Sequence, residues 1–308
     1  MKYPKFKVVV RCFTFNQSRY IEETMNGFTM QQTNFPYVCC IVDDASTDGE
    51  QQVIIEYIKE YFDITDTAVA YQKETDYAHV VYAQHKINKN CFFAALFLKE
   101  NHYSQRKSKM AYLKEWNDGV PYEALCEGDD YWIATDKLQM QADFLDENPE
   151  YGLTYSQAFM CNQNGEIYKS IILGSSGCHS FSEMIEQNPV PTLSTMFRRA
   201  LYEKYRICIK PNPLWKMGDY PIWLFFSLNS KVHFFEKPLA VYRVLSESAS
   251  HSRNTKKKLQ FLKGQYLLRK EFVRYANRMD LLNKCRRKYL YDIAVAYLYQ
   301  IAVALKIK

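Results

Sequence analysis

The chain has 308 residues, of which 47% are hydrophobic and 16% aromatic, so it can bury the core of one large domain with an appendage. Residues 256–308 hold 14 Lys or Arg against 3 Asp or Glu, a net charge of +11, whereas residues 1–255 hold 26 against 31, a net charge of −5. Nine scattered cysteines without paired metal-ligand spacing exclude a disulfide framework and a zinc site, and they predict reduced, buried thiols.

The first residues give no sign of a targeting segment. The run Met1-Lys2-Tyr3-Pro4-Lys5 leads directly into an apolar strand, without the apolar region of a signal peptide. No segment has the apolar length that a membrane-spanning helix needs. These features predict a cytoplasmic protein, at most peripheral at the inner membrane face.

Two units of strand, turn and helix open the chain. Residues 6–15 form a Val-rich apolar run that ends before Asn16, and apolar residues at helical spacing follow. Residues 37–42 form a second β-prone run, which ends in Asp43-Asp44 and precedes a helix expected over residues 53–61. This repeat predicts an α/β fold with a mostly parallel sheet flanked by helices. Ligands bind such sheets at the carboxyl ends of the strands, where these polar side chains meet.

The pattern of apolar and turn residues predicts further elements along the chain. They are strands over residues 69–71, 151–159 and 193–197, helices over residues 88–97 and 138–145, and a loop over residues 160–190.

Three carboxylates lie within four residues, directly after the apolar stretch 122–126. Glu127, Asp129 and Asp130 would repel one another without a cation, and hard oxygen ligands suit Mg²⁺ or Mn²⁺ that carries a diphosphate. Gly128 between them permits a sharp bend. The cluster therefore favours a metal site, and a solvated acidic turn is the alternative.

Two later residues are candidates for chemistry. Asp219 follows Gly218 where a loop meets an expected helix, so its carboxylate could serve as a general base or simply cap the helix. His251 stands in the Ser-rich run 248–252, where a lone His either reaches a diphosphate or metal or is merely exposed.

The basic tail, residues 256–308, has helical periodicity and contains the mainly apolar stretch 293–305. A basic amphipathic helix fits the anionic face of a membrane, and no recognisable nucleic-acid module accompanies it. A solvated helical pair that caps the preceding domain fits the pattern equally well, and an oligomer contact is a third alternative.

Three ordered motifs carry a family resemblance. They are Phe13-Thr14-Phe15-Asn16, then Val42-Asp43-Asp44-Ala45-Ser46-Thr47-Asp48, then Glu127-Gly128-Asp129-Asp130 with Asp136-Lys137-Leu138 beyond. Over residues 6–250 the chain resembles the inverting family 2 glycosyltransferases of the GT-A fold. The resemblance implies a GT-A domain at residues 1–255, with a Rossmann-like sheet, and a helical C-terminal extension at residues 256–308. It implies transfer of a hexose from a nucleotide sugar, UDP-linked, to a glycan or lipid-linked acceptor in the synthesis of a surface polysaccharide such as capsule, O-antigen or exopolysaccharide.

The same resemblance implies roles for single residues. Asp219 matches the catalytic base, and Mn²⁺ or Mg²⁺ is expected at Glu127, Asp129, Asp130 and His251. Glu127 takes the first acidic position of the family's Asp-x-Asp element, which makes Asp130 the expected principal ligand, and Phe15 stands where Tyr is usual. The residues expected to contact the nucleotide-sugar donor are Phe13, Phe15, Asn16, Asp44 and Asp129.

Two other classes of protein are weaker alternatives. A nucleotide-dependent oxidoreductase would share the alternation of strand and helix, but the turn at residues 13–18 lacks the glycines that let a backbone approach a pyrophosphate. A non-catalytic adaptor at a membrane surface would explain the basic tail, but it would leave the acidic cluster and Asp219 without a role.

Overall fold

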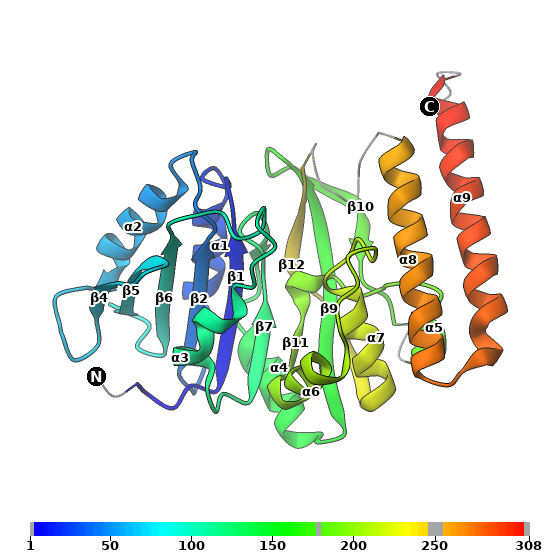
Figure 1. Cartoon of the computed structure of the whole chain (residues 1–308). Helices are drawn as coiled ribbons and strands as arrows, with labels where there is room; N and C mark the ends of the chain where they lie inside the picture. Colours follow the sequence, from blue (N-terminus) through cyan, green and yellow to red (C-terminus); the bar gives the residue numbers. More distant parts are fainter. Residues whose placement is uncertain (1–2, 177–179, 246–254, 305–308) are drawn as a thin grey trace.

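The computed structural model describes residues 3–176, 180–245 and 255–304. One 12-stranded sheet runs through the molecule, with its central strands β6 (Cys91–Leu98), β2 (Tyr37–Asp43), β1 (Val8–Thr14) and β7 (Tyr122–Leu125) side by side and parallel (Figure 1). Every residue of β2 and β6 is buried, as expected for strands that are covered on both faces. The predicted α/β class with a parallel sheet flanked by helices is therefore confirmed.

Antiparallel strands extend this centre on both sides. Beyond β6 lie β5 (Ala78–His85), β4 (Tyr71–Glu74) and β3 (Phe62–Asp63). Beyond β7 lie β11 (Met196–Arg198), β9 (Tyr151–Asn162), β12 (Lys231–Val244), β8 (Tyr131–Trp132) and β10 (Ile167–Leu173), among which only β9 and β12 pair in parallel.

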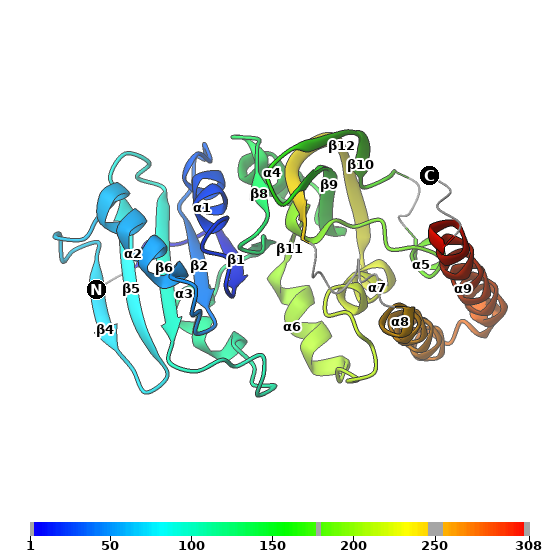
Figure 2. The same cartoon turned by 90° about the horizontal axis from the view of Figure 1, so that it is seen from above.

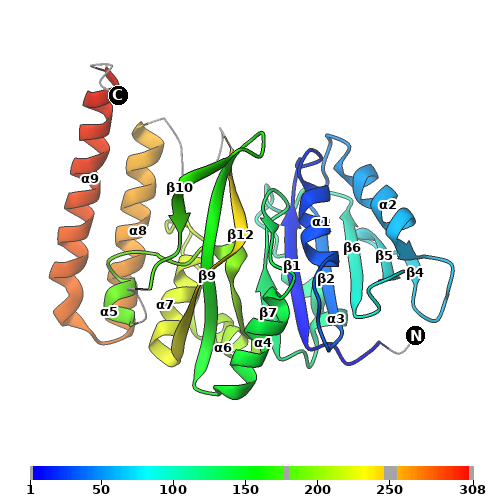
Figure 3. The same ribbon diagram turned by 180° about the vertical axis from the view of Figure 1, so that it is seen from behind.

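Helices cover both faces of the sheet. The helices α1 (Ile21–Thr29), α2 (Glu50–Tyr61) and α4 (Lys137–Glu147) lie on the face turned to the viewer in Figure 3. The opposite face carries α3 (Lys114–Asn117), α6 (Arg199–Cys208) and α7 (Tyr220–Asn229). Side chains of β1 point alternately to the two faces of the sheet. Val8 and Val10 pack in the core under α1, while Val9 packs in the core under α3. The remaining short elements are α5 (Phe181–Met184) and 3₁₀ turns at Met110–Leu113, Thr192–Ser194 and Met279–Leu281.

Several predicted elements need correction. Residues 88–97 do not form a helix but contain β6, because an eight-residue apolar run is equally suited to a fully buried strand. The strand expected at 69–71 begins at Tyr71, and its partner β5 was not predicted. The expected loop 160–190 contains β10 and α5, and the strand expected at 193–197 is a 3₁₀ turn followed by β11.

The tail forms a helical hairpin of α8 (Thr255–Tyr275) and α9 (Leu282–Ala304), as Figure 2 shows from above. Leu268, Phe272 and Val273 of α8 are buried in the same hydrophobic core as Trp223 and Phe226 of α7. One face of the hairpin therefore caps the preceding domain.

Seven of the eight described cysteines are buried, and all eight are free thiols, as predicted. None of the described helices combines the length and the apolar character required to cross a bilayer.

Candidate active site

The carboxyl ends of several strands meet at one edge of the sheet. Strands β1, β2 and β7 run in the same direction, and they end at Thr14, Asp43 and Leu125. Since β11 is antiparallel to both β7 and β9, and β9 is parallel to β12, the last strand also ends at this edge, at Val244. The topology thus brings together segments that lie more than 200 residues apart.

A pocket of about 560 Å³ opens at this edge. Three of the residues predicted to bind the donor line it, namely Phe13, Phe15 and Asp44, and the Phe15 side chain is 44% exposed. The other lining residues are Thr14, Gln17, Asn101, Tyr103, Ser104 and Lys109. The four from the segment 101–109 were not identified from the sequence, because this polar loop carries no motif of its own.

Asp44 fixes that loop. Its Oδ1 accepts a hydrogen bond from the backbone N–H of His102 (2.7 Å), and its Oδ2 accepts from the N–H of Tyr103 (3.0 Å) and from Lys109 Nζ (2.8 Å). Burial alone would raise the pKa of Asp44, but the bonds from Lys109 and the two amides lower it below its usual value. Asp44 therefore stays ionised, and both of its oxygens hold the pocket wall.

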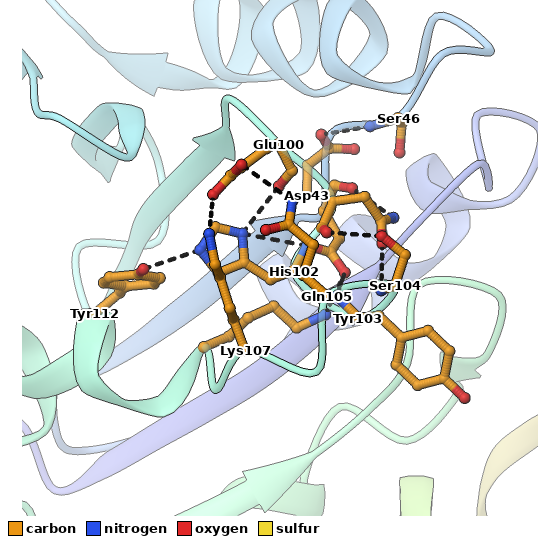
Figure 4. A network of polar contacts seen from close by, with 12 residues as sticks. Asp43, Ser46, Glu100, His102, Tyr103, Ser104, Gln105, Lys107 and Tyr112 are labelled. Atoms are coloured by element: carbon orange, nitrogen blue, oxygen red, sulfur yellow. Dashed lines mark hydrogen bonds and ion pairs between the residues drawn. The ribbon is translucent and has the colours of Figure 1, made fainter.

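The neighbouring loop residues continue this network, which Figure 4 shows from close by. The His102 ring contacts the Glu100 carbonyl oxygen through Nδ1 (2.9 Å) and the Tyr112 hydroxyl through Nε2 (2.9 Å). Asp43 accepts from the backbone N–H of Ser46 through Oδ1 (3.1 Å). Asp43 thus supports the loop after β2.

Asn16 is not among the residues that line the pocket. It has a positive φ of 53°, which Asn tolerates better than most residues, and its Oδ1 accepts a hydrogen bond from the Thr47 N–H (2.8 Å). Its own N–H donates to Ser46 Oγ (2.8 Å). These bonds join the turn after β1 to the turn after β2, and a contact with the donor stays a prediction.

The acidic loop after β7 also lies at this edge. Burial and the neighbouring Asp129 and Asp219 raise the pKa of Glu127 to about 7, and burial also raises the pKa of Asp129. Gly128 is required here, because a Cβ atom would overlap the Thr14 side chain. Glu127 and Asp129 are both partly exposed, so both carboxylates are accessible at the edge.

Asp130, expected to be the principal metal ligand, is instead 3% exposed. Its Oδ1 accepts a hydrogen bond from the backbone N–H of Arg243 (2.8 Å), which ties the acidic loop to the end of β12. The Arg243 side chain donates to the Asp129 carbonyl oxygen (2.9 Å) and pairs with Glu23. These contacts favour Glu127 and Asp129 over Asp130 as the carboxylates that face a ligand.

Within residues 3–176, 180–245 and 255–304, no group of three or more His, Cys, Asp or Glu side chains is arranged to hold a metal ion. A pair of carboxylates is nevertheless sufficient for Mg²⁺ or Mn²⁺ when a substrate diphosphate and waters complete the coordination. Glu127 and Asp129 fit this requirement. The pKa of each carboxyl group is raised, and a bound cation would lower it again by stabilising the ionised form. His251, the other predicted ligand, lies outside the described residues.

Asp219 lies at the start of α7 and caps it, since its Oδ1 accepts from the N–H of Tyr220 (2.8 Å). Its Oδ2 accepts from the Thr192 hydroxyl (2.7 Å). The carboxylate is close enough to Glu127 to raise the pKa of that group. The cap predicted for Asp219 is confirmed, and its side chain is partly exposed. Its role as a base stays a prediction.

No protein-family model matches the chain. Uncharacterized proteins of Mycobacterium bovis and Mycobacterium tuberculosis are 25% identical over 244 residues, which make up 79% of this chain and 60% of each relative. The chain therefore spans about three fifths of the length of these relatives.

Solved structures show the same fold. TarS of S. aureus in complex with UDP-GlcNAc superposes with a TM-score of 0.61 at 17% identity, covering 98% of this chain and 76% of that one. The mannosyltransferase PcManGT of Pyrobaculum calidifontis in complex with GDP-Man and Mn²⁺ gives a TM-score of 0.55 at 14% identity, covering 98% and 79%. The chain thus has the α/β fold of proteins whose structures hold nucleotide sugars.

Proposed function

We propose that this protein is an inverting glycosyltransferase of the family 2 type, which moves a hexose from a nucleotide sugar to a glycan or lipid-linked acceptor in surface polysaccharide synthesis. The observation that carries the proposal is geometric: strands β1, β2, β7 and β12 end at one edge of the sheet, where the accessible carboxylates of Glu127 and Asp129 follow β7 and Asp219 begins α7. The pocket lined by Phe13 and Asp44 opens at the same edge of the sheet.

The pocket suits the nucleoside part of the donor. Phe13, Phe15 and Tyr103 offer aromatic surface to a base, and Asn101 and Ser104 offer polar groups to its edge or to the ribose. A UDP-linked donor is favoured by the likeness to TarS in complex with UDP-GlcNAc. The complex of PcManGT with GDP-Man makes a GDP-linked donor the alternative for the binding screen.

Glu127 and Asp129 would hold Mn²⁺ or Mg²⁺ together with the donor diphosphate. When bound, the cation would neutralise the negative charge that develops on the leaving diphosphate. The Mn²⁺ in the structure of PcManGT supports this choice of cofactor.

Asp219 acts as the general base. It removes the proton of the acceptor hydroxyl, whose oxygen then forms a bond to the anomeric carbon while the bond from that carbon to the diphosphate oxygen breaks. Attack from the face opposite the leaving group inverts the configuration. The two hydrogen bonds to Asp219 fix the orientation of its carboxylate.

The test is a thermal-shift screen of nucleotide sugars with and without Mn²⁺, followed by hydrolysis and transfer assays with the donor that binds. We expect one nucleotide sugar to raise the melting temperature in a metal-dependent manner. A protein that binds none of them, yet binds membranes, would be the non-catalytic adaptor. Binding and reduction of a nicotinamide cofactor would identify an oxidoreductase instead.

A further inference from the structure

The helical hairpin has an inner face that packs on the domain and an outer face that does not. Arg269 of α8 donates to the Tyr220 hydroxyl (3.2 Å), and Lys284 of α9 donates to the Ser182 carbonyl oxygen (3.2 Å). Gly264 lets α8 approach the loop before α7 so closely that a Cβ atom would meet the Leu214 carbonyl oxygen at 2.6 Å. These contacts define the inner face.

The outer face of α8 is basic. Lys256, Lys263 and Arg274 are exposed, and their spacing of 7 and 11 residues places them on one side of the helix. Arg286 and Arg287 near the start of α9 are exposed as well. The three side chains of α8 thus form a row of positive charge, and α9 adds two more exposed basic side chains.

The acidic residues of the hairpin do not neutralise this row. Glu271 turns inward and accepts hydrogen bonds from Trp215 Nε1 (2.9 Å) and Asn212 Nδ2 (3.0 Å). Asp280 pairs with Arg278, and Asp292 pairs with Lys288 and Arg269. Residues 256–299 contain no other Asp or Glu, so the positive charge of the outer face has no acidic counterpart there.

The outer face of α9 is apolar and aromatic. Leu290 is 54% exposed and Leu298 64% exposed, and Tyr291, Tyr297 and Tyr299 are exposed beside them. Tyr and Leu side chains next to Lys and Arg are the composition that enters the headgroup region of an anionic bilayer. A protein partner with an acidic and apolar surface would be the other kind of occupant, but nothing in the described part of the chain selects one.

We propose that this outer face, made of Lys256, Lys263, Arg274, Arg286, Arg287, Leu290, Tyr291, Tyr297, Leu298 and Tyr299, binds the surface of an anionic phospholipid bilayer. Strand β12 ends at the catalytic edge, and α8 begins eleven positions later in the sequence. The N-terminal end of α8 and the C-terminal end of α9 lie next to each other in Figures 1 and 3. The bound hairpin would thus keep the catalytic edge close to a membrane-held acceptor, and only this last step rests on the proposed function.

The test is cosedimentation of the full chain with phosphatidylcholine vesicles, with and without phosphatidylglycerol, at low and high salt. We expect binding that requires phosphatidylglycerol and weakens with salt, because each basic side chain near an anionic surface adds attraction that is screened within a Debye length. Lys256→Glu/Lys263→Glu should weaken binding by about tenfold or more. Leu290→Ser/Leu298→Ser should weaken it without removing its dependence on phosphatidylglycerol.

Lys59→Glu/Lys89→Glu is the matched control, since it makes the same charge change at exposed positions outside the hairpin, and it should bind like the wild type. Melting temperature and donor-induced thermal shift verify that each variant is folded and binds donor. Vesicle binding that is absent at low salt, or equal in the wild type and the Lys256→Glu/Lys263→Glu variant, would overturn the proposal while leaving donor binding intact. A dimer that Leu290→Ser/Leu298→Ser dissociates, seen by sedimentation velocity without lipid, would overturn it in favour of a second copy of the chain.

Discussion

The hydroxyl of Thr192 donates a hydrogen bond of 2.7 Å to Oδ2 of Asp219, the carboxylate proposed as the base. Two side chains hold the turn that carries Thr192. Trp132 Nε1 donates to the Leu193 carbonyl oxygen (2.8 Å), and Gln141 Nε2 donates to the Ser194 carbonyl oxygen (2.9 Å). Thr192 thus holds the Asp219 carboxylate in position, from a turn that is itself hydrogen-bonded to Trp132 and Gln141.

Replacing Thr192 tests this role. Thr192→Val keeps the shape of the side chain but removes the donor, and a hydrogen bond to a charged group contributes about 1.5–3 kcal/mol. We expect kcat to fall about tenfold or more while the KM for the donor stays nearly constant. Thr192→Ser, the matched control, should retain most of the activity. A donor KM that rises with unchanged kcat would contradict the role.

Asp219→Asn tests the base itself. A positioned base contributes about 10²–10⁴ in rate, so turnover should fall by that factor, whereas the affinity for the nucleotide should change little. The Asn side-chain oxygen can still accept from the Tyr220 N–H, and the helix cap and the melting temperature should therefore survive. A large drop in melting temperature would show that the cap is the main role of this residue.

The accessible carboxylates predict how metal affinity depends on pH. The pKa of Glu127 is raised to about 7, above the usual value of about 4.3, so the folded protein holds this proton more tightly than the unfolded chain does. The stability that this proton contributes is present at low pH and is lost as the pH rises towards 7. Because a cation must displace the proton, Mn²⁺ affinity measured by calorimetry should increase between pH 6 and 8 on the order of tenfold.

Two substitutions distinguish a carboxylate that binds the metal, proposed for Asp129, from one that stabilises the acidic loop, proposed for Asp130. Asp129→Asn should weaken Mn²⁺ binding with little change in stability. Asp130→Asn should chiefly lower the melting temperature, because the carboxylate that accepts from the Arg243 N–H is buried. Equal effects of both variants on Mn²⁺ affinity, with unchanged stability, would support the prediction that Asp130 is a ligand.

Asp44→Ala should release the wall of the pocket. The amides of His102 and Tyr103 lose their acceptors in this variant, so their hydrogen exchange should accelerate, and donor affinity should fall. Lys109→Met, which leaves both amide bonds in place, is the control for exchange at these two amides. Unchanged exchange in Asp44→Ala would show that the loop is held by other contacts.

The sequence alone was sufficient to predict the α/β class of the fold and the edge of the sheet at which the candidate active site lies. Val8–Val10 and residues 37–42 are β-prone runs followed by polar turns, and this local pattern predicts the order strand, helix, strand, helix over residues 6–61. The run Cys91–Leu98 was misassigned, because a short apolar segment does not distinguish a buried strand from a buried helix without knowledge of its neighbours.

The details of the site depended on contacts between distant segments. That Asp44 holds the loop 101–109, and that Asp130 turns inward to Arg243, follows from pairings across about 60 and 113 positions, which no local pattern records. The sequence of α8 was ambiguous for the same reason, because an amphipathic helix fits both a cap on the domain and a membrane contact. The burial of Phe272 against the domain shows that α8 forms the cap.

The most direct test of the proposed function is the anomeric configuration of the transferred sugar, followed by NMR with the nucleotide sugar that the thermal-shift screen selects, in the presence of Mn²⁺ and a glycan or lipid-linked acceptor. Transfer with inversion, lost in Asp219→Asn, is the predicted result. Transfer with retention, or transfer that persists at the normal rate in Asp219→Asn, would contradict the assignment of this carboxylate as the base of an inverting glycosyltransferase.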